Sequence, residues 1–539
     1  MSDSNTMRYR IILTLLTGFT SVFVYAQVYQ PDLGNGKYKN PIIHADYSDP
    51  DVVRVGDDFF MVASSFNCVP GLPLLHSKDL VNWSIINNVI QKLEPAEAFD
   101  QPQHGNGVWA PSIRYHAGWY YVFYGDPDYG IYMCRTRNPW GEWEPPHLVR
   151  AAKGWIDACP FWDDDGNAYL VHAFAGSRAA IKSILVLHKM SIDGTVLLDD
   201  GVLVFDGHKD HPTIEGPKMY KRNGYYYIFA PGGGVEFGWQ TVLRSRNIYG
   251  PYEDKIVLSQ NDTDINGPHQ GAWIDTPNGE SWFVHFQDKR AYGRITHLQP
   301  AEWKNDWIVI GEDKDGDGNG SPVLTWTKPN VGKSYPVQAP QTSDEFNGTE
   351  LGLQWQWHGN PQATWVFPTN QGFLRMNPVI VDPGIKSLWD IPNLLLQKFP
   401  AEQFTATAKM DAYLQNDSET VGLVIMGLNY ASLALQREGD QLVLVVSECK
   451  DADKGQSEKE IDRMPVASGM NLQLSATITS GSKYSFSYSS DGKNFRKIGP
   501  EFTAREGKWI GTKVGLYSIR DKHINDGGYT NVDWFRIEK

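Results

Sequence analysis

The sequence contains few cysteines, and their positions exclude two kinds of protein. Four cysteines, Cys68, Cys134, Cys159 and Cys449, occur among 539 residues, and none belongs to a C-x-x-C pair. So few cysteines cannot hold together a small disulfide-rich scaffold, and their spacing argues against a zinc site of clustered thiolates. Because they stand in apolar or strand-like surroundings, we expect small buried hydrophobic residues, with one disulfide as the alternative.

The sequence also lacks an excess of positive charge and a nucleotide-binding motif. With a net charge of −14, the chain has no electrostatic reason to bind nucleic acid or an anionic membrane. No G-x-G-x-x-G segment follows a predicted strand, and the glycine-rich PGGGVEFG follows a strand but opens no helix. No nucleotide or redox cofactor is therefore indicated.

Long apolar runs are missing except near the N-terminus. Residues 1–26 carry Arg8 and Arg10, then an apolar run from Ile11, then Val-Tyr-Ala before Gln27, which is the layout of a secretory signal peptide. Its removal leaves a net charge of −15. No later segment approaches the length needed to span a bilayer, and no cysteine near the cleavage point could carry a lipid. We expect a secreted or periplasmic protein without a membrane span.

Aromatic side chains are abundant, with 19 Trp and 26 Tyr. Sugar rings stack on aromatic faces, and their hydroxyls bond to carboxylates, so this acidic, aromatic-rich composition suits a protein that handles carbohydrate. The chain is too long for one ordinary core, and two folded domains are expected.

One pattern occurs five times: a polar residue, a short apolar strand, a turn with Gly or Asp-Gly, and an aromatic strand. The copies begin roughly 50 to 60 residues apart, at Ser48 (SDPDVVRVGDDFFMVASSF), Gly107 (GVWAPSIRYHAGWYYVFYG), Ile156 (IDACPFWDDDGNAYLVHAF), Thr213 (TIEGPKMYKRNGYYYIFAP) and His269 (HQGAWIDTPNGESWFVHFQ). A third and a fourth strand are predicted after the hairpins, as in LPLLHSKDL followed by NWSIIN. Five units of four strands indicate a five-bladed β-propeller over residues 27–330, a fold that hides most strand edges by radial repetition.

The propeller prediction brings distant residues together. The first strand of each blade lines the central channel, so residues at the blade starts should converge at one end of the axis. Asp49, Trp109, Asp157, Glu215 and His269 all occupy this position. One acid there could be a turn residue, but three acids at equivalent points of three blades suggest a shared site.

A second domain is predicted after a stretch rich in Gly, Pro and Asp, residues 313–340. Residues 331–539 show two-residue alternation with hairpin signals, as in FTATAKMDAYL and TVGLVIMGL, and no convincing amphipathic helix. This pattern is typical of an all-β sandwich or jelly roll. Two roles remain open for it: binding sugar, or bracing the propeller and closing one side of its mouth.

Three carboxylates around one narrow axis cannot behave alike, because like charges in a partly dry pocket raise one another's pKa values. Glycosidic bond cleavage uses such a difference: one protonated acid assists the leaving group, and another, ionised, acts at the anomeric carbon. The spacing of the acids in the sequence does not by itself decide which residue plays which part.

The blade-start motifs S-D-P-D, W-A-P, I-D-A-C-P-F-W-D-D-D-G, E-G-P-K-M-Y-K and H-Q-G-A-W make residues from about 40 to 325 resemble a glycoside hydrolase family 43 propeller. The rest resembles the concanavalin-like sandwich of many β-xylosidase and α-L-arabinofuranosidase members. The resemblance implies inversion, with Asp49 as general base, Glu215 as general acid and Asp157 as pKa modulator. The carboxyls of the first two should then be about 6.5 to 9.5 Å apart. One departure is Ala158-Cys159-Pro160, where the family often has Pro-Ser after the aspartate.

The resemblance also implies substrate-binding residues. Arg294, in A-Y-G-R-I-T, resembles an arginine that contacts the terminal sugar, and nearby Arg290 is the alternative. Trp109 and Phe66 could stack on the sugar, although aromatic residues at strand starts are mostly core. His269 is similar to an axial histidine that, in arabinan-cleaving relatives, helps to hold calcium or a water, and a buried hydrogen-bonded histidine is the alternative.

The segment D-K-D-G-D-G-N, which begins at Asp313, resembles the start of a calcium loop. It offers carboxylates at positions 1, 3 and 5 and a glycine at position 6, but position 12 is Leu324 where a bidentate Glu is required. We interpret the segment as an acidic turn. No cofactor is expected to be required, and calcium binding is left open.

These observations favour an inverting, exo-acting glycosidase that releases xylose or arabinofuranose from plant oligosaccharides of the arabinoxylan or arabinan type. Exo action is preferred because the appended sandwich could close the groove into a pocket. One alternative is a propeller that binds sugar without turning it over. Another is a propeller scaffold for other proteins, which would need no acid in its channel.

Overall fold

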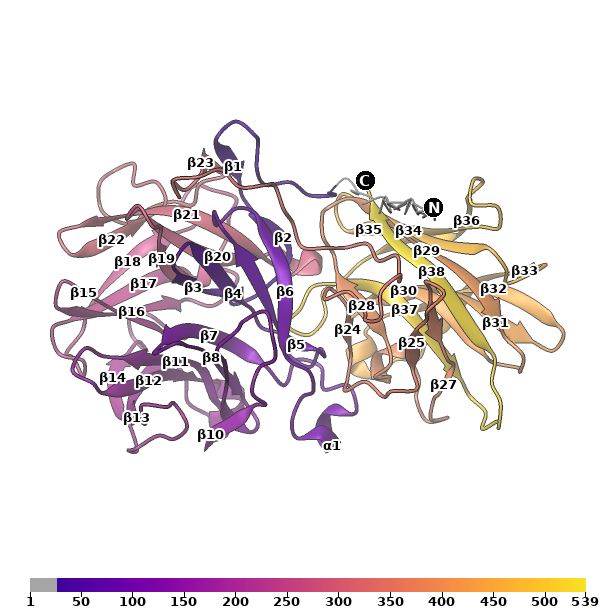
Figure 1. Cartoon of the computed structure of the whole chain (residues 1–539), viewed down its shortest axis with the longest axis horizontal. Helices are drawn as coiled ribbons and strands as arrows, with labels where there is room; N and C mark the ends of the chain where they lie inside the picture. Colours follow the sequence, from indigo (N-terminus) through magenta and orange to yellow (C-terminus); the bar gives the residue numbers. More distant parts are fainter. Residues whose placement is uncertain (1–26) are drawn as a thin grey trace, which may run out of the picture.

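A computed structural model describes residues 27–539, so the predicted signal peptide lies outside the described residues. Figure 1 shows two all-β domains side by side: a propeller, drawn from indigo to pink, and a sandwich, drawn from orange to yellow. Only two short α-helices are present in this part of the chain, α1 (Ala96–Phe99) and α2 (Gly176–Ala179). The predicted fold, a five-bladed β-propeller followed by a β-sandwich, is confirmed.

The first four blades are antiparallel sheets whose four strands follow in chain order. The first blade contains β3 (Asp51–Val55), β4 (Asp58–Val62), β5 (Gly71–Ser77) and β6 (Trp83–Ile90). The second contains β7 (Trp109–His116), β8 (Trp119–Asp126), β9 (Gly130–Thr136) and β10 (His147–Ala151). The third contains β11 (Trp155–Trp162), β12 (Ala168–Phe174), β13 (Ile184–Met190) and β14 (Val202–Asp206). The fourth contains β15 (Lys218–Arg222), β16 (Tyr225–Gly232), β17 (Trp239–Ser245) and β18 (Glu253–Ser259).

The fifth blade closes the ring with a strand from the start of the chain. It contains β19 (His269–Asp275), β20 (Ser281–Asp288), β21 (Arg294–Lys304) and β22 (Trp307–Ile310). The segment β2 (Ile43–Asp46) also pairs with β21, at Ile43–Thr296 and Asp46–Ile295. The repeat in the sequence begins at Ser48 and therefore did not predict the pairing of β2 with the fifth blade. It joins the two ends of the propeller by backbone hydrogen bonds.

Tight turns explain why the inner hairpins form where the sequence predicts them. Between β15 and β16 the turn is Asn223–Gly224, and both residues have positive φ, 49° and 73°. This is the backbone that a two-residue type I′ hairpin turn requires, and Asn-Gly adopts it at low cost. The aromatic strand that follows each turn then packs into the core between neighbouring blades.

The C-terminal sandwich consists of two large sheets. One contains β24 (Gln356–Trp357), β28 (Leu395–Lys398), β37 (Lys513–Arg520), β30 (Thr420–Met426), β31 (Tyr430–Glu438), β32 (Gln441–Cys449) and β33 (Lys459–Val466), with β27 (Val379–Ile380) added on β37. The other contains β25 (Val366–Pro368), β26 (Leu374–Met376), β38 (Tyr529–Glu538), β29 (Phe404–Tyr413), β34 (Leu472–Thr479), β35 (Lys483–Ser489) and β36 (Arg496–Thr503). A short ribbon, β1 (Lys37–Lys39) with β23 (Thr325–Thr327), lies outside both domains' main sheets.

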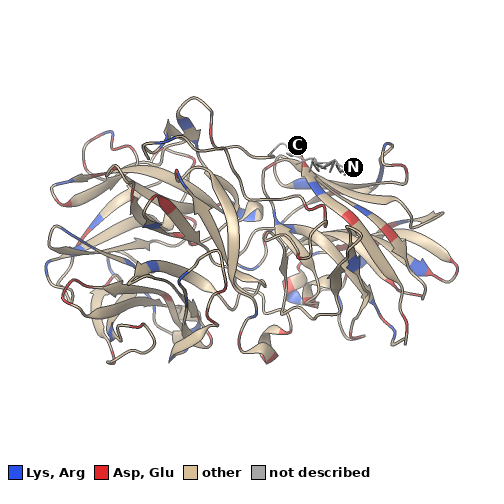
Figure 2. Cartoon of the chain, in the orientation of Figure 1, with Lys and Arg blue, Asp and Glu red and all other residues tan. Residues whose placement is uncertain are grey.

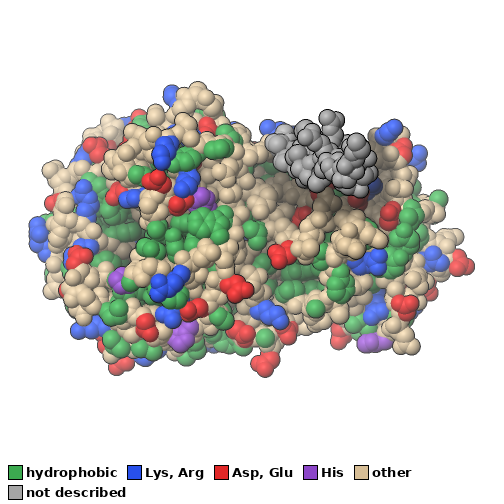
Figure 3. Space-filling model, in the orientation of Figure 1, with side chains coloured by type: hydrophobic (Ala, Val, Ile, Leu, Met, Phe, Trp, Pro, Cys, Tyr) green, Lys and Arg blue, Asp and Glu red, His purple; other side chains and the backbone are tan. Residues whose placement is uncertain are grey.

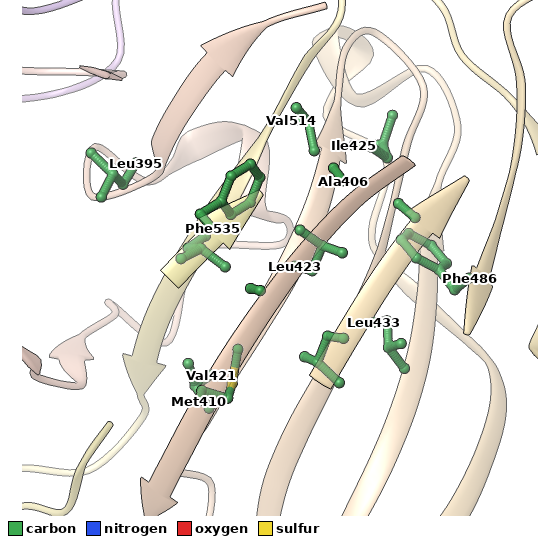
Figure 4. Packing of buried hydrophobic residues seen from close by; sticks show 14 of the residues in the cluster. Leu395, Ala406, Met410, Val421, Leu423, Ile425, Leu433, Phe486, Val514 and Phe535 are labelled. Atoms are coloured by element: carbon green, nitrogen blue, oxygen red, sulfur yellow. The ribbon is translucent and has the colours of Figure 1, made fainter. Parts of the chain in front are cut away.

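The sandwich core lies between the facing sides of these sheets. Leu423 and Leu433 from one sheet and Phe486 and Phe535 from the other are fully buried in one cluster (Figure 4). Alternate residues of each strand point inward, as the two-residue pattern in the sequence predicts. Burial of this continuous apolar layer is what holds the two sheets together.

The two domains are joined by backbone and side-chain contacts. Val69 of the propeller and Trp357 of the sandwich exchange backbone hydrogen bonds. Lys513 Nζ lies 2.9 Å from the Sγ atom of Cys68 and 3.0 Å from Gln356 Oε1, and all three residues are buried. Acidic and basic residues are interspersed over both domains (Figure 2), and the space-filling view shows one continuous elongated body (Figure 3).

All four cysteines are buried free thiols, as expected of small hydrophobic residues, and no disulfide links them. Within residues 27–539, helices are too short and too polar for any of them to cross a bilayer.

Candidate active site

The innermost strands of the blades follow one another around the axis: β19 contacts β3, β3 contacts β7, β7 contacts β11 and β11 contacts β15, and β19 also lies against β16 of the fourth blade. In β7, β11 and β19 the pairing register shifts near the start of the strand, at Trp109–Ser112, Ile156–Cys159 and His269–Gly271. Bulges of this kind re-aim side chains at the end of a sheet. Regular strand pairing is therefore interrupted at or next to three predicted site residues, Trp109, Asp157 and His269.

Asp49 lies two residues before β3 and is buried, with a left-handed backbone (φ 55°). Its Oδ2 atom accepts hydrogen bonds from Ser48 Oγ at 2.6 Å and Ser64 Oγ at 2.5 Å. Arg294 Nη1 lies 3.3 Å from Oδ1 and 3.4 Å from Oδ2. A backbone conformation that is sparsely populated for non-glycine residues is thus held in place by two hydroxyls and a guanidinium.

Asp157 stands in the β11 bulge and is also buried and left-handed (φ 60°). Its Oδ2 accepts a hydrogen bond from the backbone N–H of Gly216 at 2.8 Å. Burial raises the pKa of Asp157 well above its ordinary value, the negative charges of Glu215 and Asp49 raise it further, and the Gly216 N–H and Lys218 lower it. The charges of both other acids therefore act on Asp157, as expected of carboxylates gathered at one end of the axis.

Glu215 lies just before β15, and its side chain is 21% exposed. His269, fully buried at the start of β19, is hydrogen-bonded through Nε2 to Glu215 Oε1 at 2.9 Å. The other ring nitrogen, Nδ1, is buried and has no hydrogen-bond partner among residues 27–539. The histidine therefore fixes the rotamer of the accessible acid, and a role in holding calcium or water stays a prediction.

The two candidate arginines have different surroundings. Arg294 is buried, faces Asp49, and lies over the ring of Phe286 at 5.0 Å. The side chain of Arg290 is 78% exposed and pairs with Glu236 at 2.7 Å. Of the two arginines, Arg294 therefore lies beside the predicted catalytic acids, whereas Arg290 lies at the surface.

Three aromatic residues from two domains meet beside the acids. The Phe66 ring is 3% exposed and packs edge-on against half-buried Trp109, with ring centroids 6.2 Å apart. Trp509 of the sandwich lies 6.1 Å from Trp109 and 5.8 Å from the Arg294 guanidinium. It is 46% exposed. Trp109 and Trp509 thus offer ring surface to a ligand, whereas the buried Phe66 packs against Trp109.

Sequence reasoning missed Trp509, and nothing in its local sequence, R-E-G-K-W-I-G-T-K, points to the propeller. Its position depends on Asp46, whose Oδ1 accepts the Arg294 N–H at 2.8 Å and whose Oδ2 accepts the Gly511 N–H at 3.0 Å. A Cβ atom on Gly511 would lie 2.7 Å from the backbone nitrogen of Gly293, so only glycine permits this approach. A cavity of about 220 Å³ is lined by Arg294 and Trp509 together, at the junction of the domains.

The acidic turn follows β22, which pairs with β21 of the fifth blade. In the described part of the chain, Asp313, Asp315 and Asp317 bring their carboxylate oxygens within 4.8 Å of one another. Backbone N–H groups of the same loop bond to them, such as Gly316 to Asp313 Oδ1 at 2.9 Å. Oxygen ligands suit calcium, but the turn is also closed by its own hydrogen bonds. Binding of calcium here stays a prediction.

Two family models match the chain. Residues 38–308 match the model of glycosyl hydrolases family 43, and residues 343–538 match the beta xylosidase C-terminal concanavalin A-like domain. The chain belongs to glycoside hydrolase family 43. It is therefore a glycosidase, and the resemblance seen in the blade-start motifs is confirmed.

Relatives of this family 43 chain carry two kinds of activity in their names. A protein of Xylanibacter ruminicola, provisionally named a beta-xylosidase, is 41% identical over 90% of this chain and 86% of its own length. A beta-xylosidase of Formosa agariphila is 32% identical over 94% and 91% of the two chains. A non-reducing end alpha-L-arabinofuranosidase of Bacteroides ovatus is 27% identical over 93% and 95%.

A solved structure has the same two-domain arrangement as this family 43 chain. The crystal structure of a family 43 protein variant from Bacillus licheniformis superimposes with a TM-score of 0.80 at 27% sequence identity. The match covers 93% of this chain and 99% of the other. Propeller and sandwich therefore occur together in both proteins.

Proposed function

We propose that this family 43 enzyme is an inverting, exo-acting glycoside hydrolase that releases xylose, arabinofuranose or both from plant cell-wall oligosaccharides. The observation that carries the proposal is the set of three carboxylates in unlike surroundings at one end of the propeller axis. Asp49 is buried between hydroxyls and a guanidinium, Asp157 is buried with a raised pKa, and Glu215 is accessible. An acid–base pair with a third, modulating acid needs this asymmetry.

Glu215 is assigned as general acid. It is the most exposed of the three carboxyls, and its hydrogen bond to His269 holds its position. It would donate its proton to the glycosidic oxygen as the bond to the anomeric carbon breaks. Asp157 sits beside it, bonded to the next residue, Gly216, and acts as the electrostatic modulator of the acid.

Asp49 is assigned as general base. It belongs to the first blade and Glu215 to the fourth, and these blades are not neighbours in a ring of five. A water between the two carboxylates could lose a proton to Asp49 and attack the anomeric carbon from the side opposite to the leaving group. This gives inversion, for which a separation of about 6.5 to 9.5 Å is needed. That separation stays a prediction.

Exo action is supported by the wall that the sandwich adds. Trp509 stands beside Trp109 and Arg294, so the site is bounded by both domains. A wall on one side of the groove admits a chain end more readily than the middle of a polymer. The terminal sugar would stack on the tryptophan faces while Arg294 donates hydrogen bonds to its hydroxyls.

We keep both xylose and arabinofuranose as proposed products because the named relatives include both activities. The substrate class is therefore a neutral oligosaccharide of the arabinoxylan or arabinan type. We also propose that the enzyme acts outside the cytoplasm, on the signal-peptide pattern of residues 1–26. N-terminal sequencing of the mature protein should then begin at Gln27.

Hydrolysis of nitrophenyl β-xyloside and nitrophenyl α-arabinofuranoside tests the proposal. Loss of a general acid costs about 100- to 10,000-fold in rate. Glu215→Gln should lower kcat by this factor, and more for xylobiose than for the nitrophenyl sugar, whose leaving group needs less help. Glu302→Gln, an exposed glutamate on the fifth blade that pairs with Lys304, is the matched control. Proton NMR of the first product formed should show the inverted anomer.

Two results would overturn the proposal. Equal activity of the Glu215→Gln and Glu302→Gln variants would remove Glu215 from the reaction. Retention of the anomeric configuration would remove the role of Asp49 as a base acting on water. Binding of sugar without release by the wild-type protein would instead favour a carbohydrate-binding propeller.

A further inference from the structure

The end of the propeller axis opposite to the acids holds a cavity of about 570 Å³. Its wall comes from the last residues of the innermost strands of all five blades: 52–54 of β3, 114–116 of β7, 160–162 of β11, 219–222 of β15 and 273–275 of β19. Since each strand begins near the acids and ends here, the two sites are separated by the strand length. From Asp49 to Arg54 this is about 16 Å at ~3.3 Å per residue.

The size and aromatic content of this distal cavity suit a small organic ligand. Ligand pockets typically occupy about 300 to 1,000 Å³ and combine aromatic walls with a few polar groups. Tyr115, which is 44% exposed, and the half-buried Trp162 and Trp273 contribute to the wall. These rings can stack on the apolar faces of sugar rings.

Polar groups that could fix a ligand are also present. Arg222 lies over the ring of Trp303, with its guanidinium carbon 4.6 Å from the ring centroid. Its side chain donates no hydrogen bond to any residue in the range 27–539, so its N–H groups remain available. Asp275 adds an acceptor: Ser281 Oγ bonds to its Oδ1 at 2.6 Å, and burial raises its pKa.

The charge of the wall favours a neutral ligand. Arg114 is paired with Asp51 at 2.6 Å, and Lys221 forms ion pairs with Asp163 and Asp164. The wall also holds Arg54 and Arg222, which form no ion pair within residues 27–539, and Asp275, whose pKa both arginines lower. When Asp51 and Asp163 are counted with the wall, four carboxylates offset four cations, so the wall has no net positive charge to attract a phosphate or a uronic acid.

We propose that the distal cavity is a second, non-catalytic carbohydrate site that holds a neutral pentose chain of the class trimmed at the acids. This inference rests on the proposed function for its choice of ligand. The two sites open at opposite ends of one rigid domain, so a short oligosaccharide cannot occupy both. The distal site would hold the enzyme on a polymer and raise the effective concentration of chain ends near the acids.

Affinity electrophoresis in gels that contain soluble arabinoxylan tests the proposal. All variants carry Glu215→Gln, so that the polymer stays intact and any binding at the acids is the same in each. Arg222→Ala should weaken retention at least fivefold, and Tyr115→Ala should weaken it in the same direction. Arg246→Ala is the matched control, because Arg246 is exposed, stacks on Tyr225 at 4.0 Å and lies outside the cavity.

The same substitutions in the active enzyme give a second measurement. Arg222→Ala should keep its activity on nitrophenyl xyloside within twofold, which also shows that the variant folds, and should lose at least threefold on insoluble arabinoxylan. The inference is overturned if the arabinoxylan gel retains the Arg222→Ala, Tyr115→Ala and Arg246→Ala variants equally. It is also overturned if the gel retains none of them. If the nitrophenyl sugars are not cleaved at all, the proposed function fails, whereas the comparison of retention still decides the distal site.

Discussion

The ion pair between Arg294 and Asp49 predicts a specific coupling in stability. Both side chains are buried, and the nearest nitrogen and oxygen atoms are 3.3 Å apart. Removing one partner of a buried pair typically costs about 3 to 5 kcal/mol, because the other charge is left uncompensated. Ser48 and Ser64 still donate hydrogen bonds to Asp49 in an Arg294→Met variant. We therefore expect the lower end of this range, about 3 kcal/mol.

Thermal unfolding measures this effect. For a large domain, a loss of about 3 kcal/mol lowers Tm by about 6 °C. The double variant Asp49→Asn with Arg294→Met no longer buries an unpaired charge, and it should recover about 2 kcal/mol of the loss. Arg290→Met, at an exposed arginine four positions earlier, should change Tm by no more than about 1 °C.

The reasoning is refuted if the double variant is no more stable than Arg294→Met alone. The arginine would then contribute by packing against Phe286 and Trp509. A large loss of Tm in Arg290→Met would also contradict it, because that side chain is exposed and pairs with Glu236 at the surface.

Three further predictions concern the site and its surroundings. Trp509→Ala should raise KM for nitrophenyl xyloside about tenfold, equivalent to ~1.4 kcal/mol, with little change in kcat; Phe495→Ala, at another exposed sandwich ring, is the control, and equal KM values would count against the sandwich wall. The raised pKa of Asp157 means that wild-type stability falls as pH rises above about 4, the unfolded-state pKa. Asp157→Asn should therefore gain Tm relative to wild type as the pH rises above about 4, while losing activity, and parallel Tm curves would contradict this. A chelator should leave nitrophenyl xyloside hydrolysis unchanged, even if calcium binding at Asp313–Asp317 raises Tm. A loss of kcat on chelation would contradict the expectation that catalysis does not depend on a metal.

The repeat in the sequence predicted the blades because each blade is built from local hairpins. Turns such as Asn223–Gly224 fix the inner pairing over a few residues, and aromatic strands follow at a constant offset. Once the blades are known, topology places Asp49, Asp157 and Glu215 at one end of the axis. This part of the site follows from short-range sequence signals and one symmetry argument.

Other parts depend on contacts between residues that are far apart in the sequence. The four-residue strand β2 is too short to stand out, and its partner, β21, lies some 250 positions later. Trp509 reaches the site through the relative position of two domains, which no local pattern encodes. The left-handed conformations of Asp49 and Asp157 likewise depend on the hydrogen bonds around them, since aspartate favours this region only weakly.

Closure of the propeller, the ion pair between Arg294 and Asp49, and the position of Trp509 all involve one residue, Asp46. It ends β2, one carboxylate oxygen accepts the N–H of Arg294, and the other accepts the N–H of Gly511. The strand that closes the ring thereby sets the backbone from which Arg294 reaches Asp49, and also the loop that carries Trp509. The three acids lie on the blades, but the positions of Arg294 and Trp509 beside them depend on the joining of the two domains. Sandwich and propeller therefore both shape the proposed active site.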